Sequence, residues 1–189
     1  MRKDAKASSR ERLLEATAEL TYREGVNVGV EALCNAAGVS KRSLYQFFDT
    51  KDELLAASLE RRASAYAARL LPPPEAKLSP RERLFYPFTY LESAAAGPEY
   101  RGCPYLSVQV ELKDSDHPAR RVAHRVKGEL TKYLRAAAAD GGAVEPELLA
   151  RQLMIILDGA SARAGVKADD LSSVLLPAVT AVVDAAGVR

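Results

Sequence analysis

The sequence predicts an all-α protein of about nine helices, with a three-helix N-terminal domain followed by a C-terminal helical bundle. Apolar residues recur at helical spacing along the whole chain. Alternating apolar and polar runs bounded by turn residues, which would indicate strands, do not occur. Proline and glycine residues separate the periodic segments. With 189 residues, 48% of them hydrophobic and 28% charged, the chain fits a soluble globular protein.

The N-terminal part carries the most specific pattern, a helix-turn-helix. A first helix is expected from about Ser9 to Arg23, with Gly25 ending it. Two short helices then lie within Val30–Phe47, joined by Gly38, Val39 and Ser40 as the turn. Gly38 suits a left-handed backbone position, and Ser40 is a favoured N-cap. A second helix placed in this way can enter the major groove of DNA.

The faces of this second helix follow from a rotation of roughly 100° per residue. Three apolar residues point towards the core: Leu44, Phe47 and Phe48. Five polar residues lie on the outward face or its flanks: Lys41, Arg42, Ser43, Tyr45 and Gln46. Arginine can pair with guanine edges and glutamine with adenine, whereas lysine, serine and tyrosine can reach phosphate oxygens. The alternative is an ordinary solvated helix surface.

The remaining helices are delimited by caps and prolines. A fourth helix begins after Thr50, a favoured N-cap, and ends at the proline run of residues 72–74, which cannot continue a helix. Later helices are expected over about 80–96, 105–112, 118–139, 146–164 and 170–186. Pro87 should kink the first of these near Arg83, whose carbonyl loses its usual partner. The last helix is bent or restarted at Pro177.

The last two helices are apolar on more than one face, so each needs burial on more than one side. In a chain of this size, a four-helix bundle with the same pair of a second copy provides that burial. The predicted dimer contacts are Leu149, Leu153, Ile156, Leu175, Val179 and Val182. The alternative is a central core helix in a monomer.

A cluster of aromatic residues near Pro87 is the best indication of a ligand site, because pockets are commonly apolar and aromatic with a few polar groups. The predicted ligand contacts are Phe85, Phe88, Tyr105 and His124. Simple core packing would explain the same rings, and His124 is also compatible with a surface position. The expected ligand is an apolar or amphipathic small molecule.

The composition disfavours several other functions. The two histidines, His117 and His124, form no metal-binding spacing, and the sequence has no phosphate-binding loop and no nucleophile elbow. We therefore expect no enzyme, no metal and no cofactor. The two cysteines, Cys34 and Cys103, form no disulfide framework, and thiol sensing by Cys103 is the minor alternative. No membrane span or secretory signal is evident, which predicts a cytoplasmic protein.

The segment from Arg10 to Leu59 resembles the DNA-binding domain of the TetR family of bacterial repressors. The sequence AAGVSKRSLYQFF followed by DTKDELL is characteristic of that family. The resemblance implies that Tyr45 and Lys51 hold DNA phosphates, and that Lys41, Arg42, Ser43 and Gln46 lie at or near base edges. It departs from the family at GVNVGVEAL, where Val28 and Gly29 replace an expected hydroxyl residue, which puts one phosphate contact in doubt.

The resemblance implies a regulator, expected as a repressor, that binds a palindromic operator as a homodimer and is released by a small-molecule effector. The expected domains are residues 1–50 for DNA binding, 51–71 as a connecting helix, and 78–189 for effector binding and dimerisation. Residues 1–10 carry four basic side chains and one acidic one, so this arm either reaches DNA or serves as a solubilising tail. The alternatives are a helical ligand-binding or interaction module without DNA binding and, more remotely, a helical enzyme.

Overall fold

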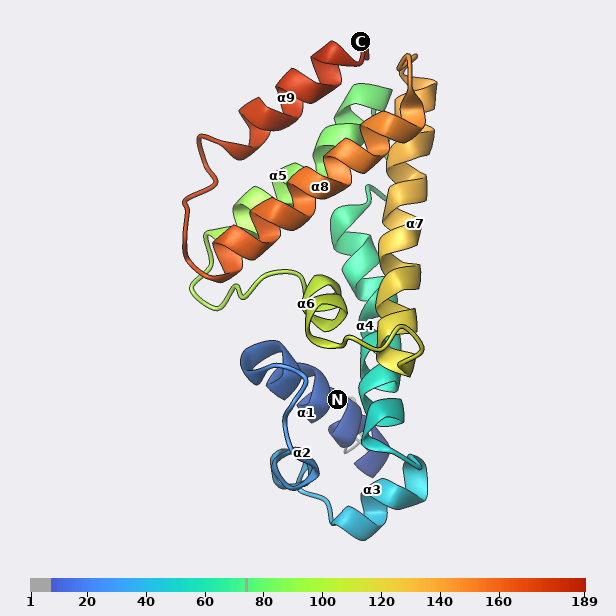
Figure 1. The fold of residues 1–189 in the computed structure, drawn as a ribbon, viewed down its shortest axis with the longest axis vertical. Helices are drawn as coiled ribbons and strands as arrows, with labels where there is room; N and C mark the ends of the chain where they lie inside the picture. Colours follow the sequence, from blue (N-terminus) through green and yellow to red (C-terminus); the bar gives the residue numbers. More distant parts are fainter. Residues whose placement is uncertain (1–7, 74) are drawn as a thin grey trace, which may run out of the picture. The chain divides into compact units, whose positions relative to one another are not determined.

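The computed structural model describes residues 8–73 and 75–189, and throughout these residues the regular structure is helical (Figure 1). This confirms the all-α prediction. The helices, in chain order, are α1 (Ser9–Glu24), α2 (Val30–Ala37), α3 (Lys41–Phe47), α4 (Lys51–Leu70), α5 (Pro80–Ala95), α6 (Pro104–Glu111), α7 (Pro118–Asp140), α8 (Pro146–Gly165) and α9 (Leu175–Ala185).

The chain forms two compact units, and their boundary differs from the linear division expected from the sequence. The first unit combines the described chain up to Arg62 with Ser107–His124, and the second combines Ala63–Leu106 with Arg125–Arg189. Residues 107–124 were expected in the C-terminal domain but pack with the N-terminal helices. Helices α4, α6 and α7 therefore each contribute residues to both units.

The first unit is built on α1, α2 and α3, which pack against one another around a small apolar core. That core includes Leu13, Leu33, Leu44 and Leu54, none of which is more than 1% exposed. The starts of α1, α3 and α4 have a local cause, since the hydroxyls of Ser8, Ser40 and Thr50 each accept a hydrogen bond from a main-chain N–H three residues later.

The position of Phe47 differs from the prediction. The ring of Phe48 is buried in the core of the first unit, whereas the ring of Phe47 is 44% exposed. A rotation of about 100° per residue places both rings close to the direction of Leu44, so helical periodicity alone does not decide which of the two is buried. The helix ends at Phe47, and Phe48 turns inward from an extended backbone with φ −142° and ψ 127°.

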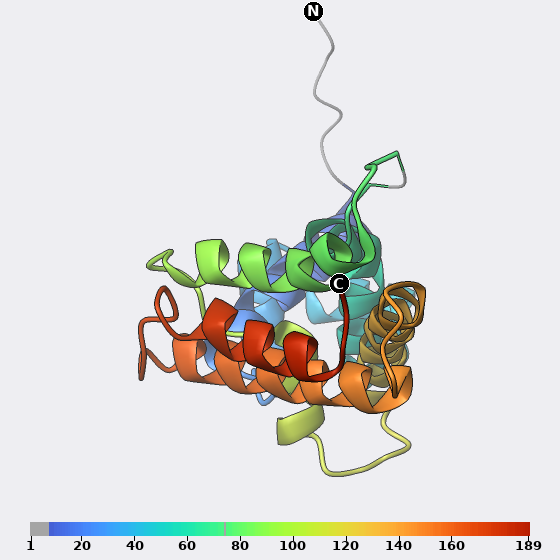
Figure 2. The same ribbon diagram turned by 90° about the horizontal axis from the view of Figure 1, so that it is seen from above.

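The second unit contains a layer of α5, α8 and α9, which pack together and lie side by side in Figures 1 and 2. Its core includes Leu84, Phe88, Leu153 and Val179, each fully buried. The close approach of two chain segments fixes the end of α8. A Cβ on Gly165 would lie 2.6 Å from the carbonyl carbon of Arg101, so only glycine fits there.

Pro87 lies inside α5, where its ring nitrogen cannot donate to the carbonyl of Arg83. The hydroxyl of Tyr133, on α7, donates a hydrogen bond to this same carbonyl at 3.2 Å. The acceptor that the proline leaves free is therefore satisfied by a side chain from another helix. The final helix begins at Leu175, later than predicted, so Pro177 falls in its first turn rather than at a bend.

Candidate nucleic-acid interface

The turn between α2 and α3 is held by the features that the sequence indicated. Gly38 adopts the left-handed conformation with φ 62°, and its N–H donates back to the end of α2. Ser40 caps α3 by accepting a hydrogen bond of 3.1 Å from the N–H of Ser43. Leu44 is fully buried beneath the helix. Together the cap and the buried leucine fix which face of α3 points outward.

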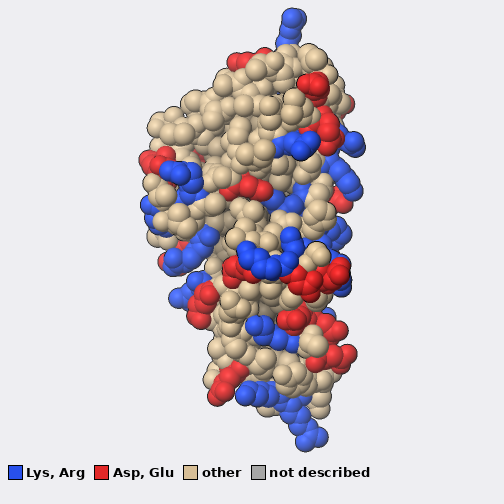
Figure 3. All heavy atoms as spheres, in the orientation of Figure 1, with Lys and Arg blue, Asp and Glu red and all other residues tan. Residues whose placement is uncertain are grey.

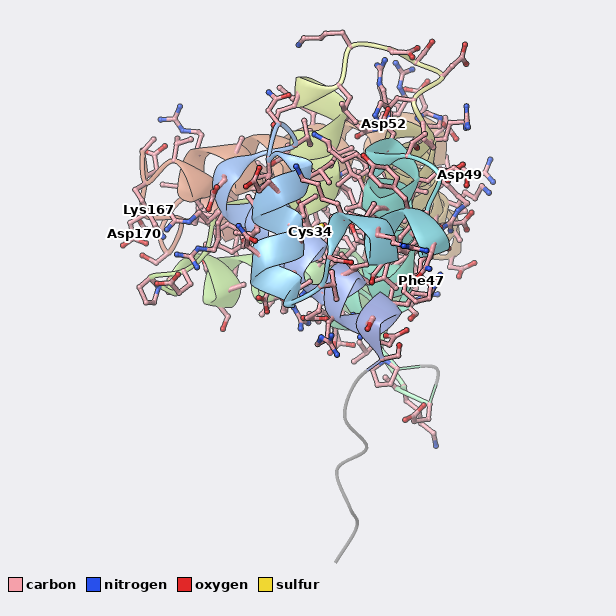
Figure 4. The ribbon with its side chains drawn as sticks, turned by 90° about the horizontal axis from the view of Figure 1, so that it is seen from below. Cys34, Phe47, Asp49, Asp52, Lys167 and Asp170 are labelled. Carbon is pink, nitrogen blue, oxygen red and sulfur yellow. The ribbon has the colours of Figure 1, made fainter. Side chains whose placement is uncertain are left out.

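The outward face of α3 presents the predicted polar set. Lys41, Arg42, Tyr45 and Gln46 are exposed, and Ser43 is half-buried with its hydroxyl 3.0 Å from that of Ser40. Figure 3 shows Lys and Arg atoms over the end of this unit that carries α2 and α3. Figure 4 shows Cys34 between α2 and α3, with Phe47 away from it near the C-terminal end of α3.

Within the part of the chain that the structure describes, Lys41 forms an ion pair with the carboxylate of Glu31 on α2, at 3.4 Å. Both side chains are more than half exposed. An exposed pair of this kind contributes little to stability and exchanges readily with water. Lys41 can therefore leave Glu31 and turn to a phosphate or a base at small cost.

Lys51 is placed differently. Its ammonium group donates hydrogen bonds to the carbonyls of Val26 and Val28, at 2.9 and 3.1 Å. These carbonyls belong to the loop between α1 and α2, so Lys51 connects the start of α4 to that loop. One of its three N–H donors is left for another acceptor. The structure thus assigns Lys51 a bracing contact that the sequence did not indicate.

The same loop is held from a second side by Glu111 at the end of α6. Its carboxylate accepts a hydrogen bond of 2.8 Å from the N–H of Val26. Gly25, with φ 90°, makes room for this contact, because a Cβ there would lie 2.7 Å from the Glu111 carboxylate oxygen. The main chain of Val26 is therefore held by an acidic side chain at its N–H and by a basic one at its carbonyl.

Two further contacts of this unit involve residues that the sequence did not single out for this role. The guanidinium of Arg12 donates to the carbonyl of Ala37 at 2.9 Å and so satisfies the C-terminal end of α2. His117 lies 3.3 Å from the carboxylate of Asp52 through Nε2, while its Nδ1 accepts from the N–H of Ala119. The Arg12–Ala37 and His117–Asp52 contacts join residues distant in sequence, so no local motif announces them.

The first and fourth helices are connected by a small charge network. Glu15 accepts hydrogen bonds from Arg61, at 2.5 Å, and from Arg62, and Arg61 also pairs with Glu11 at 2.9 Å. The hydrogen bond from Arg61, supported by the charge of Arg62, lowers the pKa of the Glu15 carboxyl below its ordinary value. The network joins the middle of α4 to α1.

The start of α2 shows the consequence of the missing hydroxyl. Gly29 is the N-cap residue, with φ −73° and ψ 152°, and no side chain caps the helix. A Cβ at this position would meet nothing within 4 Å. Position 29 therefore has room for a serine or threonine in an ordinary backbone conformation. With glycine at this position, a phosphate contact can come only from the main chain.

The predicted ligand residues do not share one environment. Phe88 and Tyr105 are fully buried in the second unit, whereas Phe85 is half-buried beneath the guanidinium of Arg81. His124 is exposed and belongs to the first unit. His124 thus belongs to a different unit from the other three, and Phe88 lies within the apolar core of the second unit.

Polar groups gather around Tyr105. Its ring lies against that of Tyr66 with the centroids 4.7 Å apart, and the Tyr66 hydroxyl lies 2.9 Å from the thiol sulfur of Cys103. Burial, followed by the charge of Cys103, raises the pKa of Tyr66 well above its ordinary range. Nearby in the same unit, the buried ammonium of Lys127 pairs with the carboxylate of Asp158.

The predicted dimer contacts divide into two groups. Leu149, Leu153, Leu175 and Val179 are at most 3% exposed within the single chain, so they serve its own core and have no surface left for a second copy. Ile156 and Val182 are half-buried. The large apolar residues of α8 that are exposed are instead Leu148 and Ile155. Figure 3 shows a largely uncharged face over α9.

Comparison with known proteins agrees with this architecture. The model of the bacterial regulatory proteins of the tetR family matches residues 13–58. A Streptomyces avermitilis protein described as a TetR-type transcriptional regulator is 57% identical, and the match covers 97% of this chain and 100% of that protein with a TM-score of 0.95. The chain belongs to the TetR family. The resemblance found in the sequence is thereby confirmed, as is the helix-turn-helix domain.

More distant solved structures share the fold. A TetR-family regulator from Streptomyces coelicolor is 23% identical, with a TM-score of 0.86 over 94% of this chain and 95% of that one. The reduced form of Escherichia coli NemR is 24% identical, with a TM-score of 0.78 over 92% and 94% of the two chains. No match was found among curated proteins.

Two remaining expectations concern the basic N-terminal arm and the absence of a membrane span. The basic residues Arg2, Lys3 and Lys6 of the N-terminal arm lie outside the described residues. Among the described helices, none combines the length and the apolar character that a bilayer span requires.

Proposed function

We propose that this TetR-family protein is a transcriptional repressor that binds a palindromic operator as a homodimer and releases it when a small molecule binds the C-terminal unit. The observation that carries the proposal is the geometry of α3. A capped helix anchored by Leu44 exposes Arg42, Tyr45 and Gln46 together. These are side chains that pair with base edges and phosphates in the major groove.

The proposed roles follow from the chemistry and reach of each side chain. Arg42 and Gln46 read bases, because both lie on the outermost ridge of the helix and form bidentate hydrogen bonds. Tyr45 and Lys41 hold the backbone, together with Ser43 where its hydroxyl can leave Ser40. Lys51 offers its remaining donor to a phosphate while it braces the loop before α2.

The test begins with selection of an operator from random duplexes, followed by anisotropy titrations at several salt concentrations. We expect Arg42→Ala to lose about 1–3 kcal/mol on the operator and to relax sequence preference at one position per half-site. Arg23→Ala, which removes an exposed arginine of α1, is the matched control and should keep both affinity and preference. Equal losses for Arg42→Ala on operator and random DNA would contradict base reading. A protein with no salt-dependent DNA binding would instead be a ligand-binding or interaction module.

Repression itself requires a separate measurement. A reporter gene placed behind the selected operator should be expressed at a lower level when the protein is present. The Arg42→Ala variant should restore expression. Higher expression with the wild-type protein would identify an activator.

Dimerisation is supported by the exposed apolar side chains on α8 and by the nearly uncharged sequence of α9, whose only charged residue is Asp184. We propose that these faces, with Ile156 and Val182 at their edges, meet the same faces of a second copy. Ile155→Asp places a charge in that interface and should shift the protein towards monomer in sedimentation. Val110→Asp, at an exposed apolar residue of α6, is the control. A wild-type monomer at micromolar concentration would contradict the proposal.

Effector binding is supported by the Tyr66 hydroxyl and the Cys103 thiol, which lie in contact where the Tyr66 ring packs against the buried Tyr105 ring. Such convergence of a few polar groups is typical of small-molecule sites. A thermal-shift screen followed by release of operator DNA tests it, with Tyr105→Phe as the variant. Phe88→Ala is unsuitable, because truncating a fully buried phenylalanine costs about 3–5 kcal/mol of stability. A ligand that stabilises Tyr105→Phe as strongly as the wild type would place the site elsewhere.

A further inference from the structure

The loop between α1 and α2 determines where α2 starts, and side chains from distant helices hold this loop. Hydroxyl side chains cap α1, α3 and α4, whereas Gly29 precedes α2 without a side-chain cap among the described residues. Lys51 donates to the carbonyls of Val26 and Val28, and Glu111 accepts from the N–H of Val26. The start of α2 therefore depends on residues that lie outside the helix-turn-helix.

Glu111 is the last residue of α6 and belongs to the first unit. Its carboxylate oxygen lies 2.8 Å from the nitrogen of Val26, a residue that is only 5% exposed. The main-chain N–H of such a buried residue needs an acceptor. A Cβ on Gly25 would lie 2.7 Å from the same oxygen, so glycine leaves the space that the carboxylate fills. Glu111 itself is exposed, so apolar packing does not account for its presence.

A carboxylate is an unfavourable group on a unit that binds DNA, because phosphates repel it. We infer that Glu111 is a positioning residue for DNA binding, which fixes the α1–α2 loop and the start of α2 through the N–H of Val26. Because α2 packs against α3, a displaced start of α2 also disturbs the helix that presents Arg42 and Gln46. Glu111 acts through the loop and has no contact with DNA in this inference, which rests on the proposed function as a DNA-binding regulator.

The test uses two substitutions that remove the same charge and differ in the acceptor. Glu111→Ala leaves the N–H of Val26 without its acceptor, whereas Glu111→Gln keeps an oxygen on a side chain of the same length. Operator affinity is measured by anisotropy titration, well below the melting temperature of each variant. We expect Glu111→Ala to bind roughly tenfold more weakly than wild type. This factor arises if the loop of each of two protomers holds its binding-competent position about a third of the time.

Glu111→Gln should bind at least as tightly as wild type, because it keeps the acceptor and loses a repulsive charge. Glu111→Asp keeps the charge but withdraws the carboxylate by one carbon, so it should also bind more weakly. Glu19 is an exposed glutamate of α1 in the same unit, and its alanine and glutamine variants are the matched controls. These two should bind alike, at or slightly above wild-type affinity.

A second reading comes from hydrogen exchange of the Val26 amide, followed by NMR. This amide should exchange faster in free Glu111→Ala than in wild type or Glu111→Gln, and operator DNA should slow it again. The slope of affinity against salt should be the same for the alanine and glutamine variants, because neither loses a phosphate contact.

Three results would overturn the inference. If Glu111→Ala and Glu111→Gln bind the operator equally well, the residue acts through its charge alone. If Glu111→Ala lowers the melting temperature but keeps the wild-type affinity, the contact stabilises the fold and does not position α2. A wild-type protein that binds no operator would refute the proposed function, and this inference with it.

Discussion

The contrast between Lys51 and Lys41 gives the sharpest prediction about the DNA-binding unit. Both are lysines of the helix-turn-helix region, and each substitution by alanine removes one positive charge. Lys51 donates to two loop carbonyls, whereas Lys41 pairs with the exposed Glu31 among the residues that the structure describes. We expect Lys51→Ala to lower both stability and DNA affinity, and Lys41→Ala to lower DNA affinity alone.

The magnitude follows from the contacts. Hydrogen bonds from a charged donor contribute about 1.5–3 kcal/mol, and the half-buried position of Lys51 favours the lower end because water can replace part of the loss. A loss of about 2 kcal/mol shifts the melting temperature of a protein of this size by roughly 4–8 °C. The exposed Lys41–Glu31 pair contributes about 0–1 kcal/mol, so its loss should leave the melting temperature nearly unchanged.

The assay is thermal denaturation followed by circular dichroism, at one protein concentration because dimerisation would couple stability to concentration. DNA titrations at several salt concentrations accompany it. If each lysine contacts a phosphate, the slope of affinity against salt should fall by about one unit per protomer for each variant. Equal melting temperatures for the two variants would show that the bonds to Val26 and Val28 contribute no stability. An unchanged salt slope for Lys51→Ala would show that Lys51 braces the loop and does not bind phosphate.

Three further predictions test individual contacts. Tyr133→Phe removes the donor that satisfies the carbonyl of Arg83 and should cost about 1–2 kcal/mol in urea denaturation, and an unchanged midpoint would contradict this role. Because folding lowers the pKa of Glu15 from its ordinary 4.5, its ionised form stabilises the fold above that pH and ceases to do so as the pH falls through the lowered value. Glu15→Gln should thus melt below the wild type at neutral pH and converge with it in acid, whereas a constant gap would exclude the charge network as the cause. Gly29→Ser should cap α2 and add a phosphate contact, which should raise DNA affinity roughly fivefold on any sequence, and unchanged binding would show that the serine reaches no phosphate.

Much of the fold could be predicted because its causes are local. The turn at Gly38, the caps at Ser40 and Thr50, and the proline boundaries are each determined by a few neighbouring residues. The outward set on α3 follows from helical rotation around Leu44. These local features are enough to predict the order of the helices and most residues of the proposed DNA-binding site.

Other features depend on contacts between distant residues and could not be read from the sequence. The choice between Phe47 and Phe48 as the buried ring depends on where α3 ends. The apolar stripes of α8 and α9 were recognised, but packing against α5 decides which stripe serves the chain's own core. The bond from Lys51 to the loop before α2 joins positions more than twenty residues apart. Helical periodicity carries no information about such pairings.

The contacts that hold the main chain of Val26 affect how this protein can be recombined with its relatives. The proline run after α4 looks like a natural junction for a hybrid regulator, with a DNA-reading module upstream and a sensing module downstream. A hybrid joined there would leave Glu111 and His117 behind, although both hold the reading module together. The DNA-binding unit that would have to be transferred is discontinuous in sequence, because it needs residues 107–124 as well as the helices up to residue 62. An exchange that carries both pieces should keep its operator preference in the new host. An exchange that carries only the first piece should keep the Lys51 contacts to the α1–α2 loop and lose the Glu111 contact.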